Sequence, residues 1–298
     1  MAATLLWGKP VAEEIYAELR ERLERLALRG VIPGLAVVRV GEAPASSAYT
    51  RQEEGAAQRL GVRVHTHALP SDASEQEVLD LIARLNKAPE VHGILVHQPL
   101  PPHISAVRVS EALDPRKDVE GLHPWNMGRL LLGEPYLVPC TAHAVWQLLV
   151  RSGYPPEGKH VVICGRSNTV GKPLAALLLQ KKPGANATIT VCHTGTPDLA
   201  RFTRQADILV VAVGAPRTVT ADMVREGAVV VDVGVNYVAD PTTRTGFRLV
   251  GDTDFEALRE KVEAITPVPG GVGPVTVAML LWNVVAVCEA QLGLPREP

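Results

Sequence analysis

The chain has 298 residues, of which 46% are hydrophobic and 21% are charged. This composition is typical of a folded globular protein, excludes a disordered chain, and leaves room for two domains. The formal net charge of −2 gives no overall basic field, so we expect neither a nucleic-acid partner nor a membrane partner.

The four cysteines form neither a CxxC pair nor a cysteine–histidine cluster with the spacing of a zinc site, so we expect no metal. They are Cys140, Cys164, Cys192 and Cys288, and free thiols are typical of a reducing compartment. The first residues do not resemble a signal peptide, and no run of 18 apolar residues is present. These observations predict a cytoplasmic protein without a membrane span.

In the first 140 residues, apolar runs alternate with amphipathic segments. Pro10 suits the first turn of a helix, and Ser74 with Glu77 forms a capping-box pattern at the start of another. The predicted strands are residues 35–40, 62–69 and 93–96, and helices are predicted from residue 10, over 46–60 and over about 75–86. This β-α-β-α-β order predicts a parallel sheet with helices on both faces.

A helix over residues 141–152 and a turn over 153–159 precede a second alternating series. Strands are predicted over residues 160–164, 187–192, 208–213 and 228–233, and helices over 171–180 and 197–204. Two such series predict two α/β domains. The last predicted helix, residues 274–292, is apolar around nearly its whole circumference, so we expect it to be buried.

The first strand of the second series leads into a turn bounded by Gly165 and Gly171. A strand, a glycine-bounded turn and a helix present backbone N–H groups and a helix N-terminus to a phosphate. The spacing is neither GxGxxG nor that of a Walker loop. A dinucleotide site and a plain strand–helix turn are therefore both compatible with these residues alone.

Two details of this region favour NADP over NAD. An acidic residue at the end of the second strand usually meets a free ribose 2′-hydroxyl, and here that strand ends in Cys192, His193, Thr194 and Gly195 without an acid. Arg166, in the first turn, carries a guanidinium that suits a 2′-phosphate. NAD stays possible.

Several blocks along the chain resemble the methylenetetrahydrofolate dehydrogenase/cyclohydrolase family, in family order and over nearly the whole chain. The N-terminal blocks are Val40-Gly41, Pro44-Ala45-Ser46 with Tyr49, Pro99-Leu100-Pro101, Lys117-Asp118-Val119-Glu120-Gly121 and Pro139-Cys140-Thr141. The C-terminal blocks are Gly165-Arg166-Ser167 with Val170-Gly171-Lys172-Pro173, Asp232-Val233-Gly234, Gly251-Asp252 and the proline- and glycine-rich run from Thr266 to Pro274.

The resemblance implies a substrate domain for a tetrahydrofolate derivative, residues 1–140 plus 275–298, and a Rossmann-type dinucleotide domain, residues 141–274. It implies that the final helix packs back on the first domain, that the folate binds between the domains, and that the protein is a homodimer. The implied reactions are oxidation of 5,10-methylenetetrahydrofolate with NADP to 5,10-methenyltetrahydrofolate, and hydrolysis of that cation to 10-formyltetrahydrofolate.

The chain departs from the family pattern at the catalytic centre. In the family pattern, the catalytic centre contains a tyrosine, a lysine four residues later, a glutamine and an aspartate. Tyr49 matches the tyrosine, but Glu53 stands at the lysine position, His97 at the glutamine position and Glu120 at the aspartate position. Hydride transfer needs orientation more than a strong base, whereas hydration of the methenyl carbon needs a group that moves protons.

The two unusual residues, Glu53 and His97, fall at positions that we expect to be neighbours. A carboxylate beside a histidine orients the ring and raises its basicity. One hypothesis is that His97, oriented by Glu53, replaces the lysine in proton transfer. The alternative is that Glu53 is solvated and His97 only hydrogen-bonds the folate.

Three functions therefore stay open: a bifunctional enzyme, a dehydrogenase that has lost hydrolysis, and a non-catalytic folate- or nucleotide-binding protein. The predicted catalytic residues are Tyr49, Glu53, His97 and Glu120. The predicted cofactor-binding residues are Gly165, Arg166, Ser167, Gly171, Lys172, His193, Thr194 and Val235. The predicted substrate-binding residues are Tyr49, Pro99, Leu100, Pro101, Glu120, Pro269, Gly270 and Gly271.

Overall fold

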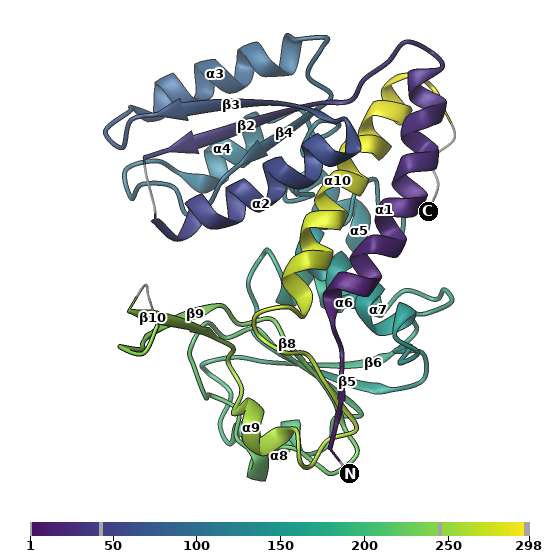
Figure 1. Ribbon diagram of the computed structural model, residues 1–298, viewed down its shortest axis with the longest axis vertical. Helices are drawn as coiled ribbons and strands as arrows, with labels where there is room; N and C mark the ends of the chain where they lie inside the picture. The colour runs from purple at the N-terminus through teal and green to yellow at the C-terminus, as the bar shows by residue number, and fades with distance from the viewer. Residues whose placement is uncertain (1, 42–43, 244–245, 295–298) are drawn as a thin grey trace. The chain divides into compact units, whose positions relative to one another are not determined.

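The computed structural model describes residues 2–41, 44–243 and 246–294, with only the backbone described for residues 44–51. The chain divides into two compact units. Unit 1 comprises Met1–Glu13 and Thr141–Thr276, and unit 2 comprises Glu14–Cys140 and Val277–Pro298. Figure 1 labels many of the helices and strands of the two units.

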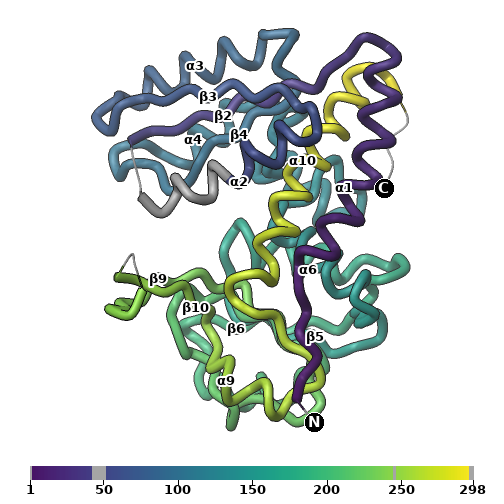
Figure 2. The backbone as a smooth tube through the Cα atoms, viewed as in Figure 1, coloured from purple at the N-terminus to yellow at the C-terminus, as the bar shows by residue number. Residues whose placement is uncertain are grey.

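Unit 2 is built on a three-stranded parallel sheet in the order β3-β2-β4, whose connections can be followed in Figure 2. Its elements are α1 (Gly8–Ala27, shared with unit 1), β2 (Gly34–Val40), α2 (Pro44–Leu60), β3 (Arg63–Leu69), α3 (Glu75–Lys87), β4 (Gly93–Val96), α4 (Ala106–Ala112) and α5 (Pro124–Leu131). All four residues of β4 are buried, and successive strand residues face opposite sides. The predicted sheet with two covered faces is confirmed.

Unit 1 is built on a six-stranded parallel sheet in the order β1-β11-β8-β7-β5-β6. Its first elements are β1 (Thr4–Leu5), α6 (Cys140–Arg151), β5 (His160–Cys164), α7 (Gly171–Leu178), β6 (Thr188–Cys192), α8 (Leu199–Thr203), β7 (Ile208–Val211) and a 3₁₀ turn η1 (Ala221–Met223). The later ones are β8 (Val229–Asp232), β9 (Asn236–Ala239), β10 (Phe247–Val250), α9 (Phe255–Leu258), β11 (Ala264–Ile265) and α10 (Val272–Gln291, shared with unit 2). Strands β9 and β10 form a separate antiparallel hairpin.

The N-terminal segment corrects the predicted domain boundary. Residues 1–13, expected in the substrate domain, belong to unit 1 because β1 pairs with β11, with Thr4 opposite Ala264 and Leu5 opposite Ile265. This pairing joins segments about 260 residues apart, and a two-residue strand carries no periodic pattern from which it could be predicted.

The last helix, α10, is by length and composition the one candidate membrane span in the described part of the chain. However, 83% of its most apolar 18-residue window is buried inside the protein. A core helix passes the same test, and the predicted burial of this helix is confirmed. From Val277 onward the helix belongs to unit 2, which agrees with the prediction that the final helix packs on the first domain.

Candidate active site

Glu53 and His97 meet inside unit 2. Glu53 lies on α2 and is 7% exposed. His97 follows β4, and its backbone N–H donates to Val38 O at 2.9 Å, which fixes the position of the ring beside β2. His97 Nε2 lies 3.2 Å from Glu53 Oε2. The predicted neighbourhood is confirmed, and a buried Glu53 is not the solvated residue of the alternative interpretation.

This contact is close, but it lacks the alignment of a hydrogen bond. Among the described residues, neither Glu53 Oε2 nor His97 Nε2 has a hydrogen-bond partner. Buried polar atoms in folded proteins normally have one. Both atoms therefore keep hydrogen-bonding capacity that a bound water or ligand could use.

Glu120 follows a segment that runs beside β4. Ile94 N donates to Lys117 O at 2.7 Å, and Ile94 forms a parallel bridge with Asp118. The Glu120 side chain is partly exposed. Loss of hydration, followed by the charges of Asp118 and Glu53, raises the pKa of its carboxyl to about 8. Glu120 is therefore mainly protonated at neutral pH and can donate a hydrogen bond as well as accept one.

The residues around this carboxyl have structural partners. Asp118 is buried and accepts hydrogen bonds from His123 N at 2.7 Å and Asn126 Nδ2 at 2.9 Å. Cys140 Sγ donates to Val119 O at 3.3 Å. Burial raises the pKa of this thiol well above its ordinary value, and the nearby carboxyls raise it further. Cys140 is therefore a neutral part of the wall and not a nucleophile.

Lys117 does not take the place of the lysine that the family pattern implies at position 53. Its ammonium donates to Ala88 O at 2.8 Å and to Leu85 O at 3.3 Å, at the C-terminal end of α3. A cation at a helix C-terminus stabilises the carbonyls left without intrahelical partners. Lys117 therefore has a structural role.

The remaining predicted folate contacts of unit 2 lie around the same elements. Tyr49 is on α2, and its side chain lies outside the described residues. The loop containing Pro99, Leu100 and Pro101 directly follows His97. Leu100 packs against the hydrophobic core of unit 2, so its side chain is at least partly structural.

In unit 1, the turn after β5 is built for close backbone approach. Gly165 has φ +130°, and a Cβ on it would lie 2.2 Å from Ala212 O. A Cβ on Gly171, at the start of α7, would lie 2.1 Å from Gly165 O. Ser167 Oγ accepts from Val170 N at 3.1 Å and holds the turn closed. Larger residues would separate the strand from the helix.

This turn leaves polar groups available to a phosphate. The N-cap residue of α7 is Val170, which offers no side-chain acceptor to the helix N-terminus. Arg166 and Ser167 are exposed beside it. Lys172 Nζ donates to Asn168 Oδ1 at 2.7 Å, on the surface of the same turn. These residues fit the anionic half of a dinucleotide, and Arg166, Ser167 and Lys172 would hold it.

The turn after β6 was predicted to lack the acidic residue that would bind a ribose hydroxyl, and the structure agrees. His193 Nδ1 accepts from Gly195 N at 3.0 Å, and Thr196 Oγ1 accepts from His193 N at 2.9 Å. Thr194 is exposed. The next acid along the chain, Asp198, accepts from Arg201 N and caps α8. A 2′-phosphate would therefore meet no carboxylate from this turn.

The predicted loop over residues 266–271 is fastened within unit 1. Gly271 N donates to Pro267 O at 2.8 Å, and Gly8 N donates to Gly270 O at 2.8 Å. Gly270 has φ +108°, and a Cβ there would lie 2.8 Å from the Trp7 ring. The N-terminal segment thus holds Gly270 and Gly271 in place, which is the behaviour of a rigid loop.

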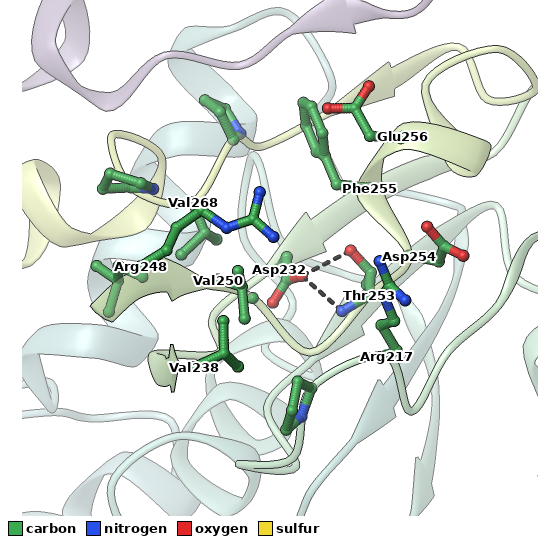
Figure 3. Close-up of a pocket in the computed structure, with 15 residues that line it drawn as sticks. Arg217, Asp232, Val238, Arg248, Val250, Thr253, Asp254, Phe255, Glu256 and Val268 are labelled. Carbon is green, nitrogen blue, oxygen red and sulfur yellow. Dashed lines mark hydrogen bonds between the residues drawn. The ribbon is translucent and has the colours of Figure 1, made fainter. Parts of the chain in front are cut away.

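Unit 1 also contains a pocket of about 590 Å³ beside this loop. Figure 3 shows Asp232 and Thr253 in its wall, where Asp232 Oδ2 accepts from Thr253 N at 2.8 Å and from Thr253 Oγ1 at 2.6 Å. Of the predicted site residues, the lining includes Pro269 but not Val235. Val235 is 63% exposed.

Sequence reasoning missed the part played by Asp232, Asp252 and Asn236. All three are joined by hydrogen bonds at the carboxyl ends of β7 and β8. The runs Asp232-Val233-Gly234 and Gly251-Asp252 were visible as family blocks, but most of their hydrogen-bond partners are backbone N–H groups, which no sequence pattern identifies.

Comparison with known proteins gives the same family for both units. Residues 6–120 match the model of the tetrahydrofolate dehydrogenase/cyclohydrolase catalytic domain, and residues 139–292 match its NAD(P)-binding domain. A bifunctional protein FolD from Syntrophus aciditrophicus is 51% identical over 294 residues, covering 99% of this chain and 100% of that protein.

Two solved structures are also similar over nearly their full length. The bifunctional FolD of Campylobacter jejuni has a TM-score of 0.90 and 43% identity, covering 97% of this chain and 100% of that one. The Trypanosoma brucei FolD, complexed with NADP cofactor and inhibitor, has a TM-score of 0.92 and 41% identity, covering 98% and 99%. The chain therefore belongs to the tetrahydrofolate dehydrogenase/cyclohydrolase family.

Proposed function

We propose that the protein oxidises 5,10-methylenetetrahydrofolate with NADP to 5,10-methenyltetrahydrofolate, and hydrolyses this cation to 10-formyltetrahydrofolate. The observation that carries the proposal is the match of both domain models, which together span most of the chain. The glycine-bounded turn of unit 1 and the polar cluster of unit 2 supply a cofactor site and a reaction centre for these steps.

The cofactor half of the proposal concerns the turn after β5 and its neighbours. Arg166, Ser167 and Lys172 bind the phosphates of NADP, with Gly165 and Gly171 allowing the backbone to approach. His193, Thr194 and Val235 complete the site. When bound, NADP accepts the hydride from the methylene carbon.

The folate half of the proposal concerns the residues around Glu53. Tyr49, Glu120 and the loop from Pro99 through Leu100 to Pro101 bind the pterin end of the folate. Pro269, Gly270 and Gly271 form a rigid binding loop for the same substrate. These assignments rest on the family pattern and on the positions of the residues in each unit.

In the hydrolytic step, His97 does the work of the absent lysine. Water adds to the methenyl carbon, and His97 Nε2 accepts the proton that this water loses. The Glu53 carboxylate, 3.2 Å away, stabilises the imidazolium that forms. His97 then gives this proton to the leaving nitrogen as its bond to the carbon breaks, and the hydroxyl proton of the adduct passes to solvent as its oxygen becomes the formyl carbonyl.

An absorbance assay tests both steps. With NADP, the methenyl band should grow and then decay faster than the uncatalysed rate. His97→Ala should slow the decay by about 10²- to 10⁴-fold while hydride transfer stays within about tenfold. His65→Ala, an exposed histidine on β3, is the matched control and should change neither step.

Each outcome of this assay has a definite meaning. Hydrolysis that is unchanged in His97→Ala would contradict the role given to His97. A methenyl band that accumulates without accelerated decay in the unmodified protein would leave a dehydrogenase alone. No band with either NADP or NAD would overturn the proposed function as a whole.

The remaining proposals concern assembly and location. We propose a homodimer formed through unit 1, because β6 is an edge strand of its sheet and carries Val191 at 38% exposure. We propose a cytoplasmic location, which is supported by four free and buried cysteines.

A further inference from the structure

Asp252 is a fully buried carboxylate with a complete set of partners. Its relative exposure is 0%. Oδ2 accepts from Val213 N at 2.7 Å and from Gly214 N at 2.9 Å, and Oδ1 accepts from Asn236 Nδ2 at 2.8 Å. Hydrogen bonds to a charged group are stronger than those to a neutral one, so Asp252 holds these two backbone groups firmly.

The two backbone groups lie at a functional place in the sheet. Strand β5 has β6 on one side and β7 on the other, so the strand order reverses at β5. Ligands of open α/β sheets bind at such a reversal, beyond the carboxyl ends of the strands. Val213 and Gly214 directly follow β7, and the neighbouring Ala212 O approaches Gly165. Asp252 therefore fixes one wall of this crevice.

A second carboxylate ties Asp252 to the end of β8. Asp232 Oδ1 accepts from Asp252 N at 2.9 Å and from Gly234 N at 2.9 Å. Glycine is required on both sides of the link. A Cβ on Gly234 would lie 2.3 Å from the Asp252 carboxyl, and one on Gly251 would lie 2.1 Å from Asp232 Oδ2. The backbone after β7 and after β8 is thus joined into one hydrogen-bonded block.

We propose that Asp252 is a positioning residue for the dinucleotide: through Val213 and Gly214, and through Asn236, it holds the walls of the cofactor crevice beyond β7 and β8. This inference rests on the proposed function, because it takes NADP as the ligand of that crevice. It adds a residue with no predicted contact to the cofactor, and it predicts a loss of cofactor affinity that is separate from folate chemistry.

Asp252→Asn tests the proposal with little change of volume. Asparagine can still accept from Val213 N and Gly214 N with its oxygen, but its amide then faces the Asn236 amide donor to donor. We expect the Kd for NADP, measured by calorimetry in the absence of folate, to rise about tenfold. The KM for NADP should rise in parallel, with little change in the KM for the folate.

A reciprocal exchange provides the rescue. In Asp252→Asn/Asn236→Asp the amide of residue 252 donates to the new carboxylate at residue 236, but the bonds from Asn236 Nδ2 to Gly251 O at 3.2 Å and to Val250 O at 3.5 Å are lost. The Kd for NADP should therefore recover in part, to below that of Asp252→Asn. A folded double variant that binds NADP no better than Asp252→Asn would overturn the proposed mechanism.

Asp207→Asn is the matched control, because its carboxylate also accepts a backbone N–H, from His160 at 2.7 Å, but at the opposite end of the strands. It should lower the Tm and leave the Kd for NADP within about twofold. Asp252→Asn with unchanged affinity, or Asp207→Asn with an equal loss, would overturn the inference.

Two further comparisons keep the test decisive. If Asp252→Asn does not fold, Asn236→Ala removes the bond to Asp252 Oδ1, together with the bonds from Asn236 Nδ2 to Gly251 O and Val250 O, and keeps both backbone bonds of Asp252. A raised Kd at unchanged Tm would support the inference, and an unchanged Kd would overturn it. Failure of the unmodified protein to bind NADP would instead contradict the proposed function, so the two failures are distinguishable.

Discussion

Exchanging a lysine for a glutamate reverses the charge of a reaction centre, yet Glu53 does not stand alone. Its carboxylate lies beside His97, and the carboxyl of Glu120 is close enough for the charge of Glu53 to raise its pKa. The proton that Glu120 keeps therefore avoids a second negative charge beside Glu53. The centre therefore contains a carboxyl, that of Glu120, whose pKa of about 8 lies near neutral pH.

Glu120 gives a pH prediction for stability. Its pKa is raised from 4.5 to about 8 in the folded protein. The folded state therefore keeps a proton that the unfolded state loses, and stability falls as the pH rises from about 4.5 to about 8. Glu120→Gln removes this loss. The Tm of the variant should exceed that of the unmodified protein by a few degrees, about 2–4 °C, at pH 9 and match it near pH 5.

Thermal melts at pH 5, 7 and 9 check this prediction. Glu111→Gln, at an exposed glutamate of the same unit, is the control and should give the same pH dependence as the unmodified protein. A Glu120→Gln variant whose Tm follows the unmodified protein at every pH would show that the Glu120 carboxyl titrates as an ordinary surface acid.

At the scale of elements, the β5–turn–α7 region depends on two glycines in van der Waals contact with backbone. Gly171→Ala would place a Cβ 2.1 Å from Gly165 O, so the turn must open. We expect the KM for NADP to rise at least about tenfold, with a smaller effect on folate. Steady-state kinetics with each substrate varied in turn measures the difference.

Gly128→Ala is the matched control for this substitution. Gly128 lies inside α5, and a Cβ there would meet nothing within 4 Å. Alanine in a helix interior is favoured over glycine, so this variant should be as stable as the unmodified protein or slightly more so. An equal rise in KM for both variants would indicate a general effect and not a local one.

The elements that the sequence predicted share a strong local signal. The capping box at Ser74 is present, with Ser74 Oγ accepting from Glu77 N, and the buried strands β4 and β5 coincide with uninterrupted apolar runs. Helices α4 and α5 are short and do not lie between two predicted strands, whereas the equally short α7 and α8 complete a strand–helix–strand order and were predicted. In the hairpin, β9 alternates partly buried and exposed residues, and β10 has two exposed residues followed by two partly buried ones, so neither strand has a buried run.

Residues of the site could be predicted where the family pattern relates their positions, but not where the contact depends on the folded backbone. The approach of Glu53 to His97 was predicted from the family resemblance, which related a position on α2 to the position that follows β4. The anchoring of Val213 and Gly214 by Asp252 could not be predicted, because backbone donors have no side-chain signature. Hydrogen bonds that span about 40 residues along the chain are settled by the fold and not by local sequence.

At the scale of the whole molecule, a buried ion pair joins α1 to α10 within unit 2. Arg22 donates to Glu289 through Nε at 3.2 Å and Nη2 at 2.6 Å, and its guanidinium lies 4.3 Å from the centre of the Trp282 ring. Arg22 is 1% exposed and Glu289 is 4% exposed. Removing one partner from such a pair leaves a buried charge without compensation.

Glu289→Gln should therefore lower the free energy of unfolding by about 3–5 kcal/mol. Replacing both residues, as in Arg22→Met/Glu289→Leu, should recover most of that loss, because an apolar pair of similar volume needs no compensation. Urea denaturation of the three proteins measures both effects. A double variant as unstable as the single one would show that the ion pair itself stabilises unit 2, and that the loss in Glu289→Gln is not the cost of an uncompensated buried charge.

Neither unit is one continuous stretch of chain. Unit 1 takes residues from both sides of unit 2, and unit 2 in turn needs residues from Val277 onward. During synthesis on a ribosome, the β1 strand must wait for β11, and α1 must wait for α10 to supply Glu289. Folding of both units is therefore coupled to completion of the chain. A gene fragment that encodes either half by simple truncation yields an incomplete core, whereas a circular permutant opened near residue 140 brings the two segments of unit 2 together, separated only by residues 1–13 of unit 1.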